Sequence, residues 1–232
     1  MTKLHLWANR KGGVGKTTLG VNVAAQTNRS ILGVPGTPAA RVDRSPAVAV
    51  ASIDKQHSVG FWVRQIEGRG GETPFDYASI DDEAQIGALR TLGHDHVFID
   101  SAGNLEEPLL HAALKECDDV LIPMDCTALS IEPTIDTVEI VKAAGKPFVI
   151  ILNNWTPGDP SEARYFADFA RGQGWPLCPA MVRHYKLHAR GALEGVTVLD
   201  YKDNVIARRA ASDITNLCQS LGFGAGINGK AL

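Results

Sequence analysis

The chain has 232 residues, of which 44% are apolar, and its 23 Lys and Arg against 26 Asp and Glu give a formal net charge of −3 at pH 7. A chain of this length can bury a sizeable core, and this composition excludes intrinsic disorder as its main state. The slightly acidic balance excludes a protein that is basic over its whole surface, so any contact with nucleic acid must come from a local basic patch.

Strand-like and helix-like segments alternate along the whole chain. Apolar runs, typical of strands buried on both faces, predict strands at residues 3–8, 48–53, 95–99, 119–123 and 148–152. Helical spacing and helix end signals predict helices at residues 16–27, at 130–144 with Ser130 as the cap, and after Asp159. A last helix is predicted from a stripe of apolar residues, Ile206, Ala210, Ile214, Leu217 and Leu221. This alternation predicts an α/β fold with a mostly parallel, twisted sheet and helices on both faces.

Two segments interrupt the alternation. Residues 28–47 contain several glycines and prolines without a clear period, which predicts a surface loop. The glycine-rich residues 223–232 are predicted to form a flexible tail. Because no repeat or internal boundary interrupts the remaining sequence, we expect a single domain over residues 1–222.

Cellular location is indicated by three features. The longest aliphatic and aromatic run, residues 148–152, is far shorter than a membrane span, and the first residues lack the hydrophobic segment of a signal peptide. The four cysteines are widely spaced and form no C-x-x-C pair, which predicts free buried thiols. These features together predict a cytoplasmic protein.

A glycine-rich loop, R-K-G-G-V-G-K-T-T at residues 10–18, joins the first predicted strand to the first predicted helix. Its glycines allow backbone N–H groups to surround phosphate oxygens, and the following helix presents its positive end. Lys16 is expected to neutralise the β- and γ-phosphates, and Thr17 to ligate Mg²⁺. We therefore expect a nucleotide on Lys11, Gly12, Gly13, Val14, Gly15, Lys16, Thr17 and Thr18. A glycine-rich turn without a ligand is the alternative.

The loop departs from the plain Walker A pattern, since Arg10 replaces its first glycine and a second lysine, Lys11, follows. The sequence K-G-G-x-G-K-T-T resembles the deviant Walker A signature of the ParA/MinD ATPases. This resemblance implies a homodimer that sandwiches ATP, in which Lys11 reaches the nucleotide of the partner subunit. We expect Lys11, Lys16 and an acidic residue, Asp54, to be the catalytic residues.

Two acidic residues follow predicted strands and are expected to serve the phosphates. Asp100 resembles the Walker B acid that holds Mg²⁺, and residues 101–105 resemble a γ-phosphate-sensing switch. Residues 52–56 resemble the D-x-D-P-Q element of the family, which implies that Asp54 positions the attacking water and Mg²⁺. Thr17, Asp54 and Asp100 are thus the expected metal residues, although either acid could instead be a strand-end cap.

The same element departs from the family pattern at two positions. Ser52 replaces its first acid and Lys55 replaces its proline. Hydrolysis is therefore expected to be slow or to depend on a partner. Trp62 lies where short ParA proteins carry tryptophan.

An asparagine pair follows the predicted strand at residues 148–152. By resemblance, Asn153 recognises the edge of adenine, and an amide offers the donor and acceptor that this edge requires. The adjacent Asn154 leaves the assignment open by one position. A loop-capping asparagine is the alternative.

The C-terminal third resembles the ParA family again at residues 179–201 and is locally basic. In ParA dimers, basic residues of this region bind DNA without sequence preference, which implies DNA contacts at Arg183, Lys186, Arg190, Arg208 and Arg209. A solvated helix face is the alternative. The resemblance is to the short partition ATPases, since the loop at residue 10 leaves no room for an N-terminal helix-turn-helix.

The resemblance implies an ATPase that binds nonspecific DNA in its ATP state and is released when a ParB-like or adaptor protein stimulates hydrolysis. Its role would be to position a plasmid, a chromosome region or another large cargo, with the ATP form on the nucleoid. One alternative is a MinD-like regulator at the membrane surface, but the tail carries only Lys230, so no stable membrane anchor is expected. Another is a metabolic or redox relative, such as an iron-protein reductase, which would need cluster cysteines.

Overall fold

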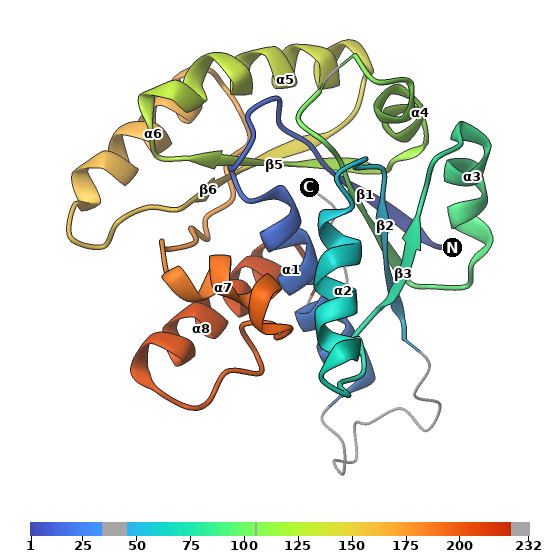
Figure 1. Cartoon of the computed structure of the whole chain (residues 1–232). Helices are drawn as coiled ribbons and strands as arrows, with labels where there is room; N and C mark the ends of the chain where they lie inside the picture. The colour runs from blue at the N-terminus through green and yellow to red at the C-terminus, as the bar shows by residue number, and fades with distance from the viewer. Residues whose placement is uncertain (34–45, 105, 224–232) are drawn as a thin grey trace.

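The computed structural model of the protein describes residues 1–33, 46–104 and 106–223. Six parallel strands form one sheet in the order β3-β2-β4-β1-β5-β6 (Figure 1). Their bounds are Lys3–Trp7 for β1, Val48–Ser52 for β2, Asp76–Ser79 for β3, His96–Asp100 for β4, Asp119–Asp125 for β5 and Phe148–Asn153 for β6. The predicted α/β fold is confirmed, and each of the five predicted strands is present to within two residues.

Helices cover both faces of this sheet (Figure 1). One face carries α1 (Lys16–Leu32), α2 (Ser58–Gly68), α7 (Lys186–Glu194) and α8 (Val205–Ser220). The other face carries α3 (Glu83–Ala88), α4 (Pro108–Glu116), α5 (Ile131–Ala143) and α6 (Pro160–Gly172). Two short 3₁₀ turns lie at Leu89–Thr91 and Ala128–Ser130. None of the helices in the described part of the chain is long and apolar enough to cross a membrane.

The two hydrophobic cores explain why the strands are continuous apolar runs. Along β1, Leu4 and Leu6 pack under α4 and its neighbours, whereas Trp7 packs against α1 on the opposite face. Successive side chains of a strand point to opposite faces, so a strand covered on both sides is apolar at most of its positions. All four cysteines are buried within these layers.

The predicted loop at residues 28–47 needs correction at its first residues. Helix α1 continues to Leu32, five residues beyond the predicted end, and its last two turns remain against α8. Asn28 is buried there, and its side-chain oxygen accepts a hydrogen bond from the backbone N–H of Ala47 at 2.8 Å. With this hydrogen bond, an asparagine can be buried at the edge of the core. Its residue type alone did not indicate a buried position in a helix. The rest of the prediction, at residues 34–45, lies outside the described residues.

The boundary of the predicted tail is also wrong by one residue. Phe223 is only 6% exposed, and its ring centroid lies 4.7 Å from that of His5, 5.5 Å from that of His96 and 5.1 Å from that of Phe98. It therefore closes the core at the amino ends of β1 and β4. Residues 224–232 lie outside the described residues.

Two further differences concern single elements. Ile206 was predicted on the apolar stripe of the last helix but is 53% exposed, because the first turn of α8 buries the neighbouring Ala207 instead. The stripe beyond it is buried, at Ala210, Ile214, Leu217 and Leu221. Strand β3 was not predicted, since it is a short edge strand whose residues are only partly buried.

Trp62 fixes helix α2 against α7. Its indole N–H donates to the carbonyl oxygen of Val196 at 3.2 Å. A side chain at Gly191 would place its Cβ 2.9 Å from this indole ring, so only glycine fits the contact. The basic C-terminal region is thereby attached rigidly to the helix that begins next to Asp54.

Candidate functional site

The carboxyl ends of the strands bring the predicted site residues together. In the sheet, Asp100 at the end of β4 lies beside Trp7 of β1 and Ser52 of β2, and Asp125 of β5 lies beside Asn153 of β6. Strand order reverses at β1, and such a switch point is where open α/β sheets bind ligands. The glycine-rich loop leaves β1 at this point. Residues as far apart in the sequence as Val14 and Asn153, which are 139 positions apart, therefore meet at one edge of the sheet.

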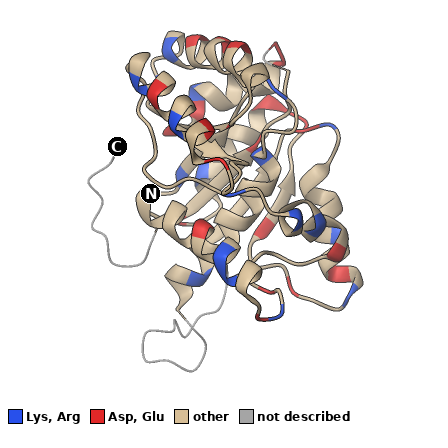
Figure 2. Cartoon of the chain, turned by 90° about the vertical axis from the view of Figure 1, so that its left-hand side faces the viewer, with Lys and Arg blue, Asp and Glu red and all other residues tan. Residues whose placement is uncertain are grey.

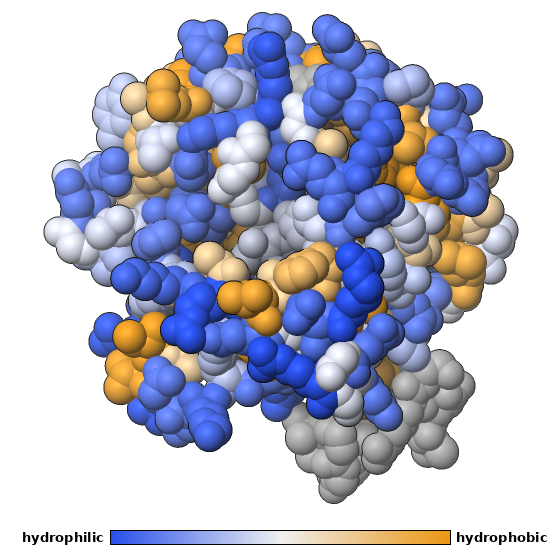
Figure 3. Space-filling model, viewed as in Figure 1, coloured by the Kyte–Doolittle hydropathy of each residue, from blue (hydrophilic) through white to orange (hydrophobic). Residues whose placement is uncertain are grey.

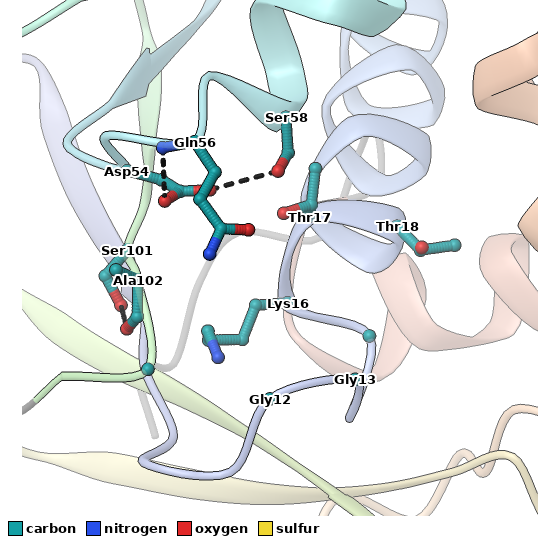
Figure 4. A pocket seen from close by; sticks show the side chains of 12 residues that line it. Gly12, Gly13, Lys16, Thr17, Thr18, Asp54, Gln56, Ser58, Ser101 and Ala102 are labelled. Carbon is teal, nitrogen blue, oxygen red and sulfur yellow. Dashed lines mark hydrogen bonds between the residues drawn. The ribbon is translucent and has the colours of Figure 1, made fainter.

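A cavity of about 260 Å³ lies over the loop (Figure 4). It is lined by Gly12, Gly13, Gly15, Lys16, Thr17, Thr18, Asp54, Gln56, Ser58, Ser101, Ala102 and Gly103. Gly15 has φ +96°, and a Cβ on it would lie 2.3 Å from the amide nitrogen of Asn153, so only glycine can occupy this position. Gly103 is equally constrained, because its Cβ would lie 2.8 Å from the carbonyl oxygen of Arg10. The loop and the segment after β4 are thus in close contact.

Lys16 extends into this cavity (Figure 4). Its ammonium donates to the carbonyl oxygens of Asn9, at 2.9 Å, and Lys11, at 3.2 Å. Burial lowers the pKa of Lys16, while the nearby carboxyls of Asp100 and Asp54 raise it. A buried cation whose partners among the described residues are backbone oxygens has charge available for an anion.

Thr17 and Asp100 form the second polar group at this edge. The Thr17 hydroxyl donates to one Asp100 carboxylate oxygen at 2.8 Å, and the other oxygen is buried with no partner among the described residues. Asp100 is fully buried, and burial raises its pKa to about 7, against the lowering effect of the Thr17 hydrogen bond. A buried carboxylate oxygen without a donor fits a site for a hard cation such as Mg²⁺, which prefers oxygen ligands.

Asp54 is held at the mouth of the cavity by the start of α2. One carboxylate oxygen accepts from the backbone N–H of Gln56 and the other from the hydroxyl of Ser58, both at 3.0 Å. The Gln56 side chain extends into the cavity between Asp54 and Lys16 (Figure 4). Ser58 was missed by the sequence analysis, although its place four residues after the acid, in the first turn of the next helix, was a usable signal.

Lys11 lies beside the cavity and contacts its own subunit. Its ammonium bonds to both carboxylate oxygens of Asp125, at 2.9 and 3.0 Å, and to the hydroxyls of Thr127 and Ser130, each at 2.9 Å. Ser130 precedes α5 as predicted, but its side chain makes no capping hydrogen bond. Its hydroxyl serves Lys11 instead. Sequence reasoning missed Asp125, whose strand-end position matches that of Asp100.

Asn153 is buried against the loop. Its amide group donates to the carbonyl oxygen of Val14 at 2.8 Å, so it braces the turn that precedes α1. Val14 is itself fully buried. Asn154 adopts a left-handed conformation with φ 57°. The expected contact of Asn153 or Asn154 with adenine stays a prediction.

The five predicted DNA contacts differ in their placement. Arg183 is removed from this set, because its guanidinium is paired with the buried carboxylate of Asp213 and lies 5.6 Å from the ring centroid of Tyr185. The hydrogen bond to Asp213 also raises the pKa of Arg183. Its positive charge is thus already neutralised within the fold, at a partner 30 residues away that no sequence pattern indicated.

The other four cations are exposed on α7 and α8. Arg190 pairs with Glu194 on the same helix, and Arg208 pairs with Asp203 at 2.9 Å. Figure 2 shows that Lys and Arg alternate with Asp and Glu on this side of the molecule. Apolar side chains also gather among hydrophilic ones over α7 and α8 (Figure 3), and those exposed there are Leu193, Val205 and Ile206. Lys186, Arg190, Arg208 and Arg209 remain available for a polyanion.

Comparisons with known proteins show what the chain is similar to. No protein-family model matches the chain. The chain is 29% identical, over 215 residues, to the maintenance of carboxysome distribution protein A of Gloeobacter kilaueensis, and the match covers 92% of this chain and 91% of that protein. Asp54, Asp100 and Asn153 all lie inside the stretch that a match of this length must span.

Solved structures show the same fold. MinD in the MinC:MinD cell division complex of Aquifex aeolicus matches with a TM-score of 0.71 and 15% identity, over 95% of each chain. The septum site-determining protein MinD of Pyrococcus horikoshii, complexed with Mg-ADP, matches with a TM-score of 0.70 and 18% identity, over 99% of this chain and 100% of that chain. At these identities the likeness concerns the fold.

Proposed function

Because the chain belongs to the ParA/MinD family of P-loop ATPases with a deviant Walker A motif, we propose that it uses ATP to position a large cellular cargo. The observation that carries this proposal is the gathering of Lys11, Lys16, Thr17, Asp54 and Asp100 around one edge of the sheet. The name of the Gloeobacter relative supports a protein assembly as cargo. A plasmid or a chromosome region, the other cargo expected from the sequence, is the alternative.

ATP would lie with its phosphates on the loop that ends in Lys16 and Thr17. The loop N–H groups, the start of α1 and the Lys16 ammonium then replace the water around the phosphate charges. Mg²⁺ would be held by Thr17, Asp100 and Asp54, all oxygen donors, and would neutralise part of the phosphate charge. Thr18 borders the same cavity and completes the predicted ATP site.

Hydrolysis needs a water molecule that is oriented toward the γ-phosphate. Asp54 is fixed by Ser58 and by the N–H of Gln56, yet a carboxylate can accept further hydrogen bonds and so orient a water. Lys55 points to Glu107, at 3.4 Å, and takes no part in this arrangement. We propose that turnover is slow until a ParB-like or adaptor protein completes the site.

DNA binding would use the exposed cations of α7 and α8 in the ATP-bound dimer. Lys186, Arg190, Arg208 and Arg209 lie on two helices that pack against α1 and α2, and pairing of two subunits doubles their number. Contacts to phosphates need no base-reading motif, so binding would ignore sequence and weaken with salt. The protein would then be cytoplasmic and associate with the nucleoid in its ATP form.

The DNA proposal is tested by an electrophoretic mobility assay with random duplex DNA at low salt, with ATP, ADP or no nucleotide. We expect retardation with ATP alone, and its loss when Arg208 and Arg209 are both replaced by Glu. A matched control reverses two exposed cations on α6 and α2, Arg164→Glu and Arg64→Glu. ATP affinity should be unchanged in both variants. Equal retardation in all nucleotide states, or equal loss in the control, would contradict this use of α7 and α8.

A further inference from the structure

The environment of Lys11 is built for an ammonium group. Four oxygens from Asp125, Thr127 and Ser130 lie within 2.9 to 3.0 Å of its nitrogen. The Lys11 side chain is 21% exposed and that of Asp125 is 15% exposed, so the pair is largely shielded from water. An ion pair in this setting, with additional hydroxyl donors and acceptors around it, is stronger than one at the surface.

The three partners are also connected to one another. Asp125 is the last residue of β5, and the Thr127 hydroxyl, in the turn that follows, lies 3.2 Å from its carboxylate and 3.4 Å from the Ser130 hydroxyl. The backbone of Lys11 is fixed as well, since its N–H donates to the side chain of Asn9 at 2.8 Å. Both ends of the lysine are therefore positioned by groups within one subunit.

The proposed function requires this ammonium at a second place. If Lys11 reaches the nucleotide of the partner subunit, it must first leave Asp125, because one ammonium cannot occupy both positions. We propose that Asp125, Thr127 and Ser130 form a lysine-holding site, which keeps Lys11 in its own subunit and sets the protein concentration at which ATP-bound subunits pair. The control of pairing rests on the proposed function. The holding of Lys11 within a single subunit does not depend on that function.

The symmetry of the pair doubles the free-energy cost of releasing Lys11. Each subunit of a pair must release one lysine, so the cost of release enters the pairing equilibrium twice. If release disfavours pairing by about fivefold per subunit, at the low end of typical couplings between sites, the dissociation constant of the pair rises about 25-fold. Asp125, Thr127 and Ser130 are then positioning residues, since they act through Lys11 and contact no substrate.

The first measurement tests the holding site without nucleotide. The purified chain is treated briefly with an amine-acylating reagent, and the acylated fraction of Lys11 is measured by peptide mass spectrometry, with the exposed Lys55 as internal reference. Asp125→Asn should raise labelling of Lys11 several-fold. Ser130→Ala, which removes one of the four contacts, should raise it less. Asp168→Asn, which removes the same charge from an exposed pair with Arg171, should leave it unchanged.

The second measurement determines the dissociation constant of the ATP-bound pair by sedimentation. Asp125→Asn should lower this constant by about 25-fold, Ser130→Ala by less, and Asp168→Asn not at all. Unchanged Lys11 labelling in Asp125→Asn and Ser130→Ala overturns the holding site. Raised labelling with an unchanged or weaker pair overturns its control of pairing. If labelling rises but neither the parent nor any variant pairs with ATP, the holding site is correct and the proposed ATP-dependent dimer is wrong.

Discussion

The two ends of the central strands both bury ionisable groups, but they use them differently. At the carboxyl ends, the fully buried Asp100 keeps one oxygen without a partner among the described residues, and Lys16 has only backbone oxygens. At the amino ends, His5 bonds to Asp119 at 2.9 Å and to His96 at 2.9 Å, and Phe223 covers both rings. The group around His5 and His96 is complete without a ligand, whereas the group around Asp100 and Lys16 is not. A buried carboxylate that lacks a partner therefore indicates function better than burial or charge alone.

The largest expected effect comes from removing the cation at the incomplete end. Lys16→Ala should weaken ATP binding by at least about 100-fold, because the phosphates lose a charged, buried hydrogen-bond donor. Stability should change little by comparison, since the ammonium contacts only loop carbonyls. Calorimetric titration with ATP measures the affinity, and Lys55→Ala, which removes an exposed lysine near the same cavity, is the control. Parent affinity in Lys16→Ala would refute the assignment of the loop.

A second change at the same end separates binding from turnover. Asp54→Ala should lower the ATP hydrolysis rate by about 100-fold or more, in the range of a lost water-positioning group, while ATP affinity stays within a few-fold. Phosphate release measures the rate, with and without a stimulating partner. Asp81→Ala, at an exposed acid in the segment after β3, serves as the comparison. A parent rate in Asp54→Ala would show that this acid does not act in hydrolysis.

Loss of the aromatic cover at the complete end should affect stability instead. Phe223→Ala opens a space beside His5, His96 and Phe98 and should lower the free energy of unfolding by about 2–4 kcal/mol. ATP affinity should remain at the parent value, since this residue lies at the opposite end of the strands. Chemical denaturation gives the stability, and Phe61→Ala, at an exposed position of α2, should cost less than about 1 kcal/mol. Equal losses in both variants would contradict the packing role.

The smallest expected effect is a pH dependence of stability from two histidines, His96 at the amino end of β4 and the buried His188 on α7. Burial, and the neighbouring His5, lower the pKa of His96 to about 4, and burial lowers the pKa of His188 on α7 to about 4 as well. In the unfolded chain both titrate near about 6.5. The unfolded state therefore binds more protons below that value, so their contribution to stability is complete above about pH 6.5 and is lost as the pH falls toward 4. The thermal midpoint should decline over this window, and His188→Leu should flatten the decline.

The comparison also explains what the sequence could predict. Asp54 and Asp100 were found because parallel strands place their carboxyl ends at one edge, so an acid after an apolar run marks that edge. The glycine-rich loop was found because its conformation demands glycine, as at Gly15. These signals are local in sequence, and the fold brings them together by a general rule.

Other features depend on partners that are distant in sequence. Asn28 stays in a helix because Ala47 supplies a hydrogen bond, and Arg183 is neutralised by Asp213, 30 residues later. The contact of Lys11 with Asp125 spans 114 residues and depends on the turn after β5. No residue pattern indicates such pairs, since each residue type is common in loops and at helix ends. They could be found only from the three-dimensional arrangement.

The central claim, that the carboxyl end of the sheet is completed by ATP and a second subunit, is tested most directly by the mass of the particle in solution. Light scattering with Mg²⁺ and ATP should give twice the mass of the single chain, whereas ADP or no nucleotide should give the single mass. Lys11→Ala should bind ATP but stay single, because the lysine that reaches the partner is absent. A single mass with ATP at all protein concentrations, or an unchanged pair in Lys11→Ala, would contradict the account.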